Sequence, residues 1–219
     1  KKYQMSYSVY LICKEEDFES KKESLQDPLI KDFHRISPQY LNNNGTVLKD
    51  LHTRYNTKPE NILGKLGCIA AHRLALLSIY NQKSTNNIIL EADAVLKEPL
   101  PDPPSLSCYM GGWMVPLSFS SKEPIQVNPN LGMNKINPDL FRIIMCHSYF
   151  IKYPTEAVEI LQRTFIPKIK NMDIHMANQK DLKFYLYPPL FTQGKHISEI
   201  DKKINKNHQY SEMYGLQTI

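Results

Sequence analysis

The sequence contains little of what marks a disulfide-rich or zinc-ribbon protein. Only four of its 219 residues are cysteine, and Cys13, Cys68, Cys108 and Cys146 are widely separated, with no CxxC spacing. Each lies in an apolar context, which favours buried free thiols over disulfides or a zinc site. Free thiols are typical of a reducing compartment, so a cytoplasmic location is expected.

Strong charge of one sign and long apolar runs are also missing. Lys and Arg number 27 against 22 Asp and Glu, a formal net charge of +5, and the basic residues are spread along the chain. A nucleic-acid-binding protein usually concentrates them in a patch, so no nucleic acid partner is expected. The mild basic balance suits anionic small molecules such as nucleotide diphosphates. No apolar stretch approaches the roughly 18 to 20 residues that cross a bilayer, so no transmembrane segment is expected.

The composition and patterning that are present indicate one soluble domain. A chain of 219 residues, 42% of them hydrophobic, can bury one substantial core. The clearest predicted elements are a strand at residues 8–13, a helix at 67–80, a strand at 88–90, a helix at 155–169 and a strand at 183–191. Their alternation predicts a single α/β domain over residues 1–219, with a mixed central β-sheet flanked by helices and a polar extension from about residue 199.

More local features are predicted along with these elements. The charged stretch at residues 14–33 is expected to be a helix that Pro28 interrupts or ends. Thr155 is expected to cap the helix at 155–169, with Phe165 on its inner face. One apolar face of the helix at 67–80 would carry Leu66, Ala70, Leu74 and Leu77. Residues 108–119 and 141–154 are each expected to form one strand-like run, and residues 124–140 a polar loop.

Two acids follow the apolar run at residues 88–90. Glu91 and Asp93 would leave the carboxyl end of a strand, where open α/β sheets place their ligand chemistry. With one residue between them in an extended segment, both side chains would point to the same side. Their oxygens are hard ligands of the kind that a divalent cation takes, so the pair predicts a metal site. The alternative is a solvated strand end.

Cys68 and His72 stand four residues apart on the predicted helix and could touch. Such a pair can be a nucleophile or half of a metal site. A histidine at the helix boundary, hydrogen-bonded to a neighbouring loop, is the preferred interpretation, because nothing nearby in the sequence completes a thiol-based site.

A glycine pair interrupts the strand-like run at residues 108–119. Gly111 and Gly112 indicate a bulge or a close approach to the backbone. A sugar or ribose lying against the backbone would use that space, and Trp113 could stack on it. Packing within the protein explains the glycines equally well.

Four polar residues further along could complete a substrate site. His147 could contact a substrate or fill a polar corner, and Asp173 could be a general base if it faces the cleft. Lys195 could pair with a phosphate and His196 could return to a metal. Both could equally lie on an exposed basic loop.

Taken in order, these segments resemble glycosyltransferase family 25, which includes lipopolysaccharide glycosyltransferases and procollagen galactosyltransferase-like proteins. The resemblance is carried by VYLIC, LGCIAAHRLAL, LEADAV, CYMGGW, HSYFIKYPTEAVEIL, MDIHM and YPPLFTQGKHIS, which run from Ser8 to Ser198. Each piece is only moderately specific, but their joint occurrence in the family's order is hard to obtain by chance.

The resemblance implies a GT-A-like (Rossmann-like) fold and a nucleotide-diphosphate sugar donor, in the first place a UDP-sugar. It also implies Mn²⁺ or Mg²⁺ at the diphosphate and a hydroxyl acceptor on a glycan or glycoprotein. Asp93 would be the main metal ligand, with His196, and Glu91 would contact ribose or metal. The donor would be contacted by Gly111, Gly112, Trp113, His147 and Lys195. In an inverting reaction Asp173 would be the base, a role that a retaining reaction would remove.

Two departures from the family pattern bear on these expectations. Ala92 replaces the first Asp of the family's acidic triplet, and Ala71 replaces the serine before His72. A divergent member from a bacterium or a virus, acting in the cytoplasm of that bacterium or of an infected host cell, would fit. Two alternatives stay open: a nucleotide-sugar-binding module without turnover, and a metal-dependent hydrolase of nucleotide sugars.

Overall fold

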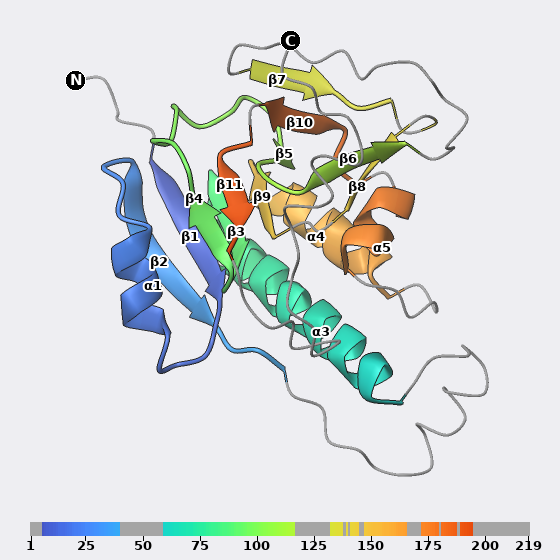
Figure 1. The fold of residues 1–219 in the computed structure, drawn as a ribbon, viewed down its shortest axis with the longest axis horizontal. Coiled ribbons are helices and arrows are strands. Elements are labelled where there is room, and N and C mark those ends of the chain that lie inside the picture. Colours follow the sequence, from blue (N-terminus) through green and yellow to red (C-terminus); the bar gives the residue numbers. More distant parts are fainter. Residues whose placement is uncertain are drawn as a thin grey trace.

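A mixed seven-stranded sheet with helices packed against it forms the centre of the protein, which confirms the predicted fold class (Figure 1). The structure is a computed structural model that describes residues 6–39, 59–116, 132–137, 139, 141–144, 147–165, 172–179, 181–187 and 189–194. The strand order is β2-β1-β3-β9-β5-β10-β7. These strands are β1 (Tyr7–Ile12), β2 (Ile30–Ile36), β3 (Asn87–Glu91), β5 (Cys108–Tyr109), β7 (Gly132–Lys135), β9 (Ser148–Ile151) and β10 (Phe184–Tyr187).

Two short ribbons and four helices complete the described fold. One ribbon pairs β4 (Ala94–Leu96) with β11 (Phe191–Gln193), and the other pairs β6 (Trp113–Pro116) with β8 (Phe141–Ile144). The helices are α1 (Phe18–Ser24), α3 (Pro59–Gln82), α4 (Pro154–Arg163) and α5 (Met172–Gln179). In Figure 1, α3 runs along the sheet, and α4 and α5 lie beside it.

In the half of the sheet that contains β1, the strands that follow β1 in the chain are added on both of its sides. β1 pairs in parallel with β2 on one side and with β3 on the other, so the chain reverses its direction of travel across the sheet after β2. Phe18 of α1 packs on one face, whereas α3 supplies Leu76 and Ile79 to the core of the other face. This arrangement leaves a topological switch point between the carboxyl ends of β1 and β3, where α/β sheets bind ligands.

The predicted strands at residues 8–13 and 88–90 are confirmed as β1 and β3. Both are buried on both faces, as expected for near-continuous apolar runs in a parallel sheet. Alternate side chains of β1 enter two separate cores: Tyr10 faces α3, and Val9 and Leu11 face the opposite side. The alternation of a strand therefore builds the two layers of the domain.

Four predicted segments differ from the structure in whole or in part. The expected helix at residues 14–33 ends at Ser24, and the segment after Pro28 forms β2, the parallel neighbour of β1. Asp27 fixes the turn between them, because one carboxylate oxygen accepts the N–H of Leu29 at 2.9 Å and the other accepts that of Leu100 at 2.9 Å.

The expected runs at 108–119 and 141–154 each divide into two strands of different sheets: β5 with β6, and β8 with β9. In the first run the chain turns at Gly112, whose φ of 96° breaks the extended path. Part of the expected polar loop at 124–140 forms β7, which pairs with β10.

The apolar face predicted for the helix at 67–80 was also wrong. Leu74 and Leu77 of that face are exposed, each at 40%. The buried face carries Ile62, Ile69, His72, Leu76 and Ile79, which recur at intervals of three, four or seven residues. Because α3 is apolar around most of its circumference, its periodicity alone did not identify the side that meets the sheet.

The start and end of α4 differ from the prediction as well. Tyr153 is the N-cap and Pro154 the first helical residue, a position where the missing N–H costs nothing, so Thr155 already lies inside the helix. Phe165 is 65% exposed instead of inward-facing. Its ring lies 4.2 Å from the guanidinium carbon of Arg73 in α3, which is a cation–π contact between α3 and the end of the α4 segment.

One of the described helices is long and apolar enough to cross a membrane by length and composition, although no apolar stretch of that length was expected from sequence. It is the segment Ile62–Gln82 of α3. Much of it packs inside the domain, where Ala75, Leu76 and Ile79 are fully buried. The core helix of a soluble domain passes the same test, so this finding is weak evidence for a membrane span.

Candidate functional site

The two acids predicted as a metal site lie at the switch point, but the chain turns between them. β3 ends at Glu91, and Ala92 and Asp93 form a turn before β4 begins. The expectation that both carboxylates point to the same side of an extended segment was therefore wrong. Glu91 meets side chains of α3, whereas Asp93 meets β11.

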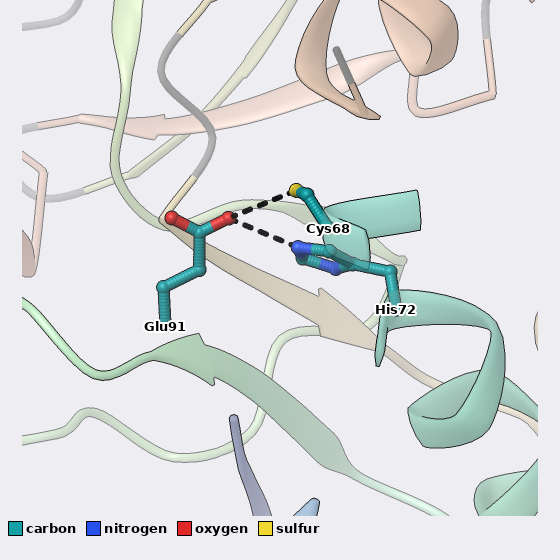
Figure 2. Close-up of side chains that lie close together, drawn as sticks. All are labelled: Cys68, His72 and Glu91. Carbon is teal, nitrogen blue, oxygen red and sulfur yellow. Dashed lines mark hydrogen bonds and ion pairs between the residues drawn. The ribbon is translucent and has the colours of Figure 1, made fainter. Parts of the chain in front are cut away.

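Glu91 completes a group with the two α3 residues that the sequence analysis paired. The His72 Nε2 lies 3.0 Å from Glu91 Oε1, and the Cys68 thiol donates to the same oxygen across 4.0 Å (Figure 2). One ligand atom from each residue lies within 4.8 Å of the others, so Cys68, His72 and Glu91 could hold a metal ion. His72 is in the middle of α3 and 1% exposed, not at a helix boundary beside a loop as preferred from sequence.

The second ring nitrogen of His72 is also engaged. Its Nδ1 lies 2.8 Å from the Tyr149 hydroxyl of β9, and the two rings stack with centroids 5.7 Å apart. A neutral imidazole satisfies both contacts if Nε2–H donates to Glu91 and the tyrosine O–H donates to Nδ1. Tyr149 was not identified from sequence, because it sits within an apolar run and nothing there indicates a use for its hydroxyl.

Three acids from two parts of the chain act electrostatically on Cys68. Burial raises the pKa of the Cys68 thiol well above its usual value, and the charge of Glu91 raises it next. Asp173 raises the pKa further, and Asp93 does so more weakly. The backbone N–H of Met172, at the start of α5, lowers it by hydrogen bonding to the sulfur. The predicted base Asp173 is thus near enough to Cys68 for its charge to act on the thiol.

Asp93 is 8% exposed and is held by the ribbon between β4 and β11. The side-chain amide of Gln193 donates to Asp93 Oδ2, and the backbone N–H of Gly194 donates to the Asp93 carbonyl at 2.7 Å. Gln193 also pairs with Ala94 in the ribbon. The end of β11 therefore lies beside Asp93 at the exit of β3.

Gly111 and Gly112 are explained by packing within the protein. A Cβ at Gly111 would lie 2.6 Å from His147 Nε2 and 2.9 Å from the Phe191 carbonyl oxygen. Gly112 has a φ of 96°, which disfavours other residues, and its carbonyl accepts the Tyr185 hydroxyl at 3.3 Å. The side chain of His147 and the backbone of Phe191 already require a glycine at position 111. A sugar contact at this backbone stays a prediction.

His147 is 2% exposed and lies beside the end of β3. Its carbonyl accepts the backbone N–H of Glu91 at 2.9 Å, while its ring lies against Gly111. This burial matches the interpretation that the His147 side chain fills a polar corner of the fold. Substrate contact by His147 stays a prediction.

The remaining predicted residues are only partly described. Trp113 begins β6 and pairs with Ile144, but its side chain is outside the description. Lys195 and His196, the expected phosphate and metal contacts, lie outside the described residues. The same is true of Cys146, whereas the other three cysteines are free thiols, as predicted.

The two acids therefore offer different sets of donor atoms. The group at Glu91 combines sulfur, nitrogen and oxygen, and Asp93 is not a member of it. Asp93 is accompanied by an amide and offers carboxylate oxygen alone.

Comparison with known proteins does not identify a family: no protein-family model matches the sequence, and no curated protein matches it by sequence similarity. The resemblance to glycosyltransferase family 25 stays a prediction.

Proposed function

We propose that the protein is a metal-dependent glycosyltransferase that moves a sugar from a nucleotide-diphosphate sugar to a hydroxyl group of a glycan or glycoprotein. The expected donor is a UDP-sugar. The observation that carries the proposal is Asp93, a buried carboxylate held by Gln193 at the exit of β3. The order of the resembling segments along the chain supports it independently.

The position of Asp93 in the sheet supports nucleotide binding. β2, β1 and β3 are parallel and end at the same edge, and the order β2-β1-β3 makes the gap between β1 and β3 a switch point. Open sheets of this kind bind nucleotides in the crevice beyond these strand ends. A buried carboxylate there costs desolvation energy, and an ion bound with the substrate would offset that cost.

The donor chemistry of Asp93 fits the ion that the resemblance implies. Carboxylate oxygen is a hard ligand of the kind that Mn²⁺ and Mg²⁺ take, and Asp93 would be the described residue that holds the ion. When bound, such an ion supplies positive charge to the diphosphate of the donor. Gln193 contributes by fixing the orientation of the carboxylate, because its amide occupies Oδ2.

Asp173 supports the inverting form of the reaction. Glycosyl transfer has an oxocarbenium-like transition state, and inversion needs a carboxylate that accepts the proton of the attacking hydroxyl. Asp173 is half-buried at the start of α5, and its charge acts on Cys68, next to Glu91. Asp173 comes from a part of the chain about 80 residues after Glu91 and Asp93, and its charge still acts on Cys68.

The test is donor hydrolysis and transfer with a panel of nucleotide sugars and Mn²⁺, in wild type and in Asp93→Ala. We expect slow, EDTA-sensitive release of sugar from one donor, a loss on the order of 100-fold in Asp93→Ala, and sugar on an added acceptor. Asp102→Ala is the matched control, because Asp102 is an exposed acid on the loop after β4.

The other outcomes separate the alternatives. Donor binding without turnover under any acceptor would indicate a binding module, and hydrolysis without transfer would indicate a hydrolase. Turnover that survives Asp93→Ala at the wild-type rate would contradict the proposal.

A further inference from the structure

The group of Cys68, His72 and Glu91 has a composition that the donor site does not need. Two of its members stand one helical turn apart on α3, and the third ends β3. We propose that these three residues form a separate site for a thiolate-binding transition metal, with Zn²⁺ as its natural ion. The proposal does not depend on glycosyl transfer, because it concerns the metal content of the protein.

The distances suit a small tetrahedral ion. Around Zn²⁺, neighbouring ligand atoms of a sulfur, nitrogen and oxygen set are roughly 3.4 to 3.6 Å apart, given the usual bond lengths. Here the His72 Nε2 and Glu91 Oε1 are 3.0 Å apart, and the Cys68 sulfur is 4.0 Å from the same oxygen. Figure 2 shows the thiol and the ring nitrogen both directed at the carboxylate. Shifts of a few tenths of an ångström would place an ion between them.

The choice of metal follows from the donor atoms. Thiolate and imidazole favour Zn²⁺ and other late transition metals, whereas Mn²⁺ and Mg²⁺ prefer oxygen ligands. The described charges acting on Cys68 are the carboxylates of Glu91, Asp173 and Asp93. A divalent cation would offset the repulsion among these groups and stabilise the thiolate.

The surroundings of His72 match those of a metal-bound histidine. With Nε2 on the metal, Nδ1 carries the proton and donates to the Tyr149 hydroxyl oxygen 2.8 Å away. A hydrogen bond of this kind fixes the tautomer and the ring orientation of a ligating histidine. The His72 side chain is 2% exposed, so packing holds it in place.

The group is more exposed at its Glu91 end than at its His72 end. The Glu91 side chain is 32% exposed, in contrast to the buried His72. An ion can therefore enter past Glu91. Three protein ligands would leave a fourth position for water, as in zinc sites that are not closed by a fourth side chain.

The experiment is a titration of the metal-free full-length chain with Co²⁺, a spectroscopic substitute for Zn²⁺. Wild type should develop a sulfur-to-cobalt charge-transfer band that added Zn²⁺ removes. The band should be lost in Cys68→Ser, whereas Cys13→Ala and Cys108→Ala should retain it, since both of these buried cysteines lie outside the group. Far-ultraviolet circular dichroism checks that each variant is folded.

A second variant keeps the test decisive if the Cys68 substitution unfolds the protein. Glu91→Gln preserves size at a partly exposed position, and we expect it to weaken Co²⁺ binding at least tenfold. A wild-type titration without the band, a band that persists in folded Cys68→Ser, or unchanged affinity in Glu91→Gln would overturn the proposal. A loss of donor turnover alone would not bear on it, so the two proposals fail separately.

Discussion

Glu91 and Asp93 differ by two positions in the sequence and lie in different chemical surroundings. Glu91 ends β3 and contacts sulfur and nitrogen donors on α3. Asp93 lies in the turn after β3 and is held by amides of Gln193 and Gly194. The exit of a strand can thus direct two nearby acids to different groups of side chains when the chain turns between them. A pair of nearby acids in a sequence need not bind one ion.

The largest expected effect separates the two acids directly. Asp93→Ala should reduce donor turnover on the order of 100-fold while leaving the sulfur-to-cobalt band intact, because Asp93 is outside the Cys68 group. Parallel activity assays and cobalt titrations of this one variant give the measurement. Loss of the band along with turnover would mean that both acids serve one ion, and the comparison would fail.

The second prediction concerns the ion pair of Asp181 and Arg163. The buried Asp181 carboxylate pairs with Arg163 at 2.8 Å, between α4 and the segment after α5. Burial raises the pKa of Asp181 from 3.8 to about 6, although Arg163 lowers it. The protonated form is therefore favoured by folding. This stability is fully present below pH 3.8 and is lost as the pH rises through about 6.

The size of that effect follows from the shift in pKa. A shift of one pKa unit corresponds to about 1.4 kcal/mol. The shift of Asp181 should therefore lower the free energy of unfolding by about 3 kcal/mol between pH 3.5 and pH 7. Urea unfolding between these pH values measures it, with Asp181→Asn as the comparison. The free energy of unfolding of Asp181→Asn should vary less with pH than that of wild type. If it varies as much, the pH dependence of stability arises from other groups.

A third change affects the packing that the two regions share. Gly111 lies against the His147 ring on the Glu91 side and against the Phe191 carbonyl on the β11 side. We expect Gly111→Ala to lower the free energy of unfolding by about 1 to 3 kcal/mol, because the added methyl group overlaps both. Denaturant titration measures this loss. If stability is unchanged, the two regions are less tightly packed against each other than described.

The smallest predicted effect probes one hydrogen bond on the Glu91 side. Tyr149→Phe keeps the stacked ring and removes the hydroxyl that contacts His72 Nδ1. Co²⁺ affinity should fall about tenfold, a typical cost of losing such a partner, with the charge-transfer band retained. Nucleotide binding should not change. An unaltered cobalt affinity would mean that the hydroxyl does not orient the ring.

Much of the fold could be predicted from the sequence, because buried parallel strands have distinctive apolar runs. The strands at 8–13 and 88–90 follow from local pattern alone, and so does the presence of a helix within residues 155–163, although the predicted bounds of 155–169 were not those of α4. β2 could not be predicted in this way, since its side chains are mostly half-buried and charged residues precede it. The buried face of α3 depends on its partners, because apolar residues surround the helix.

The site was predictable in position and less so in composition. The sequence placed Glu91 and Asp93 at a strand exit, and it paired Cys68 with His72. It did not join these pairs correctly, because the result depends on where β3 ends and the turn begins. Contacts across 19 and 77 residues, from His72 to Glu91 and to Tyr149, arise only when α3 packs on the sheet.

The central claim, that Asp93 holds a cation for a nucleotide diphosphate, is tested most directly by calorimetric titration of uridine diphosphate into wild type and Asp93→Ala, with and without Mn²⁺. We predict binding to wild type that requires Mn²⁺ and is lost in Asp93→Ala, with Asp102→Ala behaving as wild type. Binding of equal strength in Asp93→Ala, or no binding to wild type in the presence of Mn²⁺, would contradict the claim.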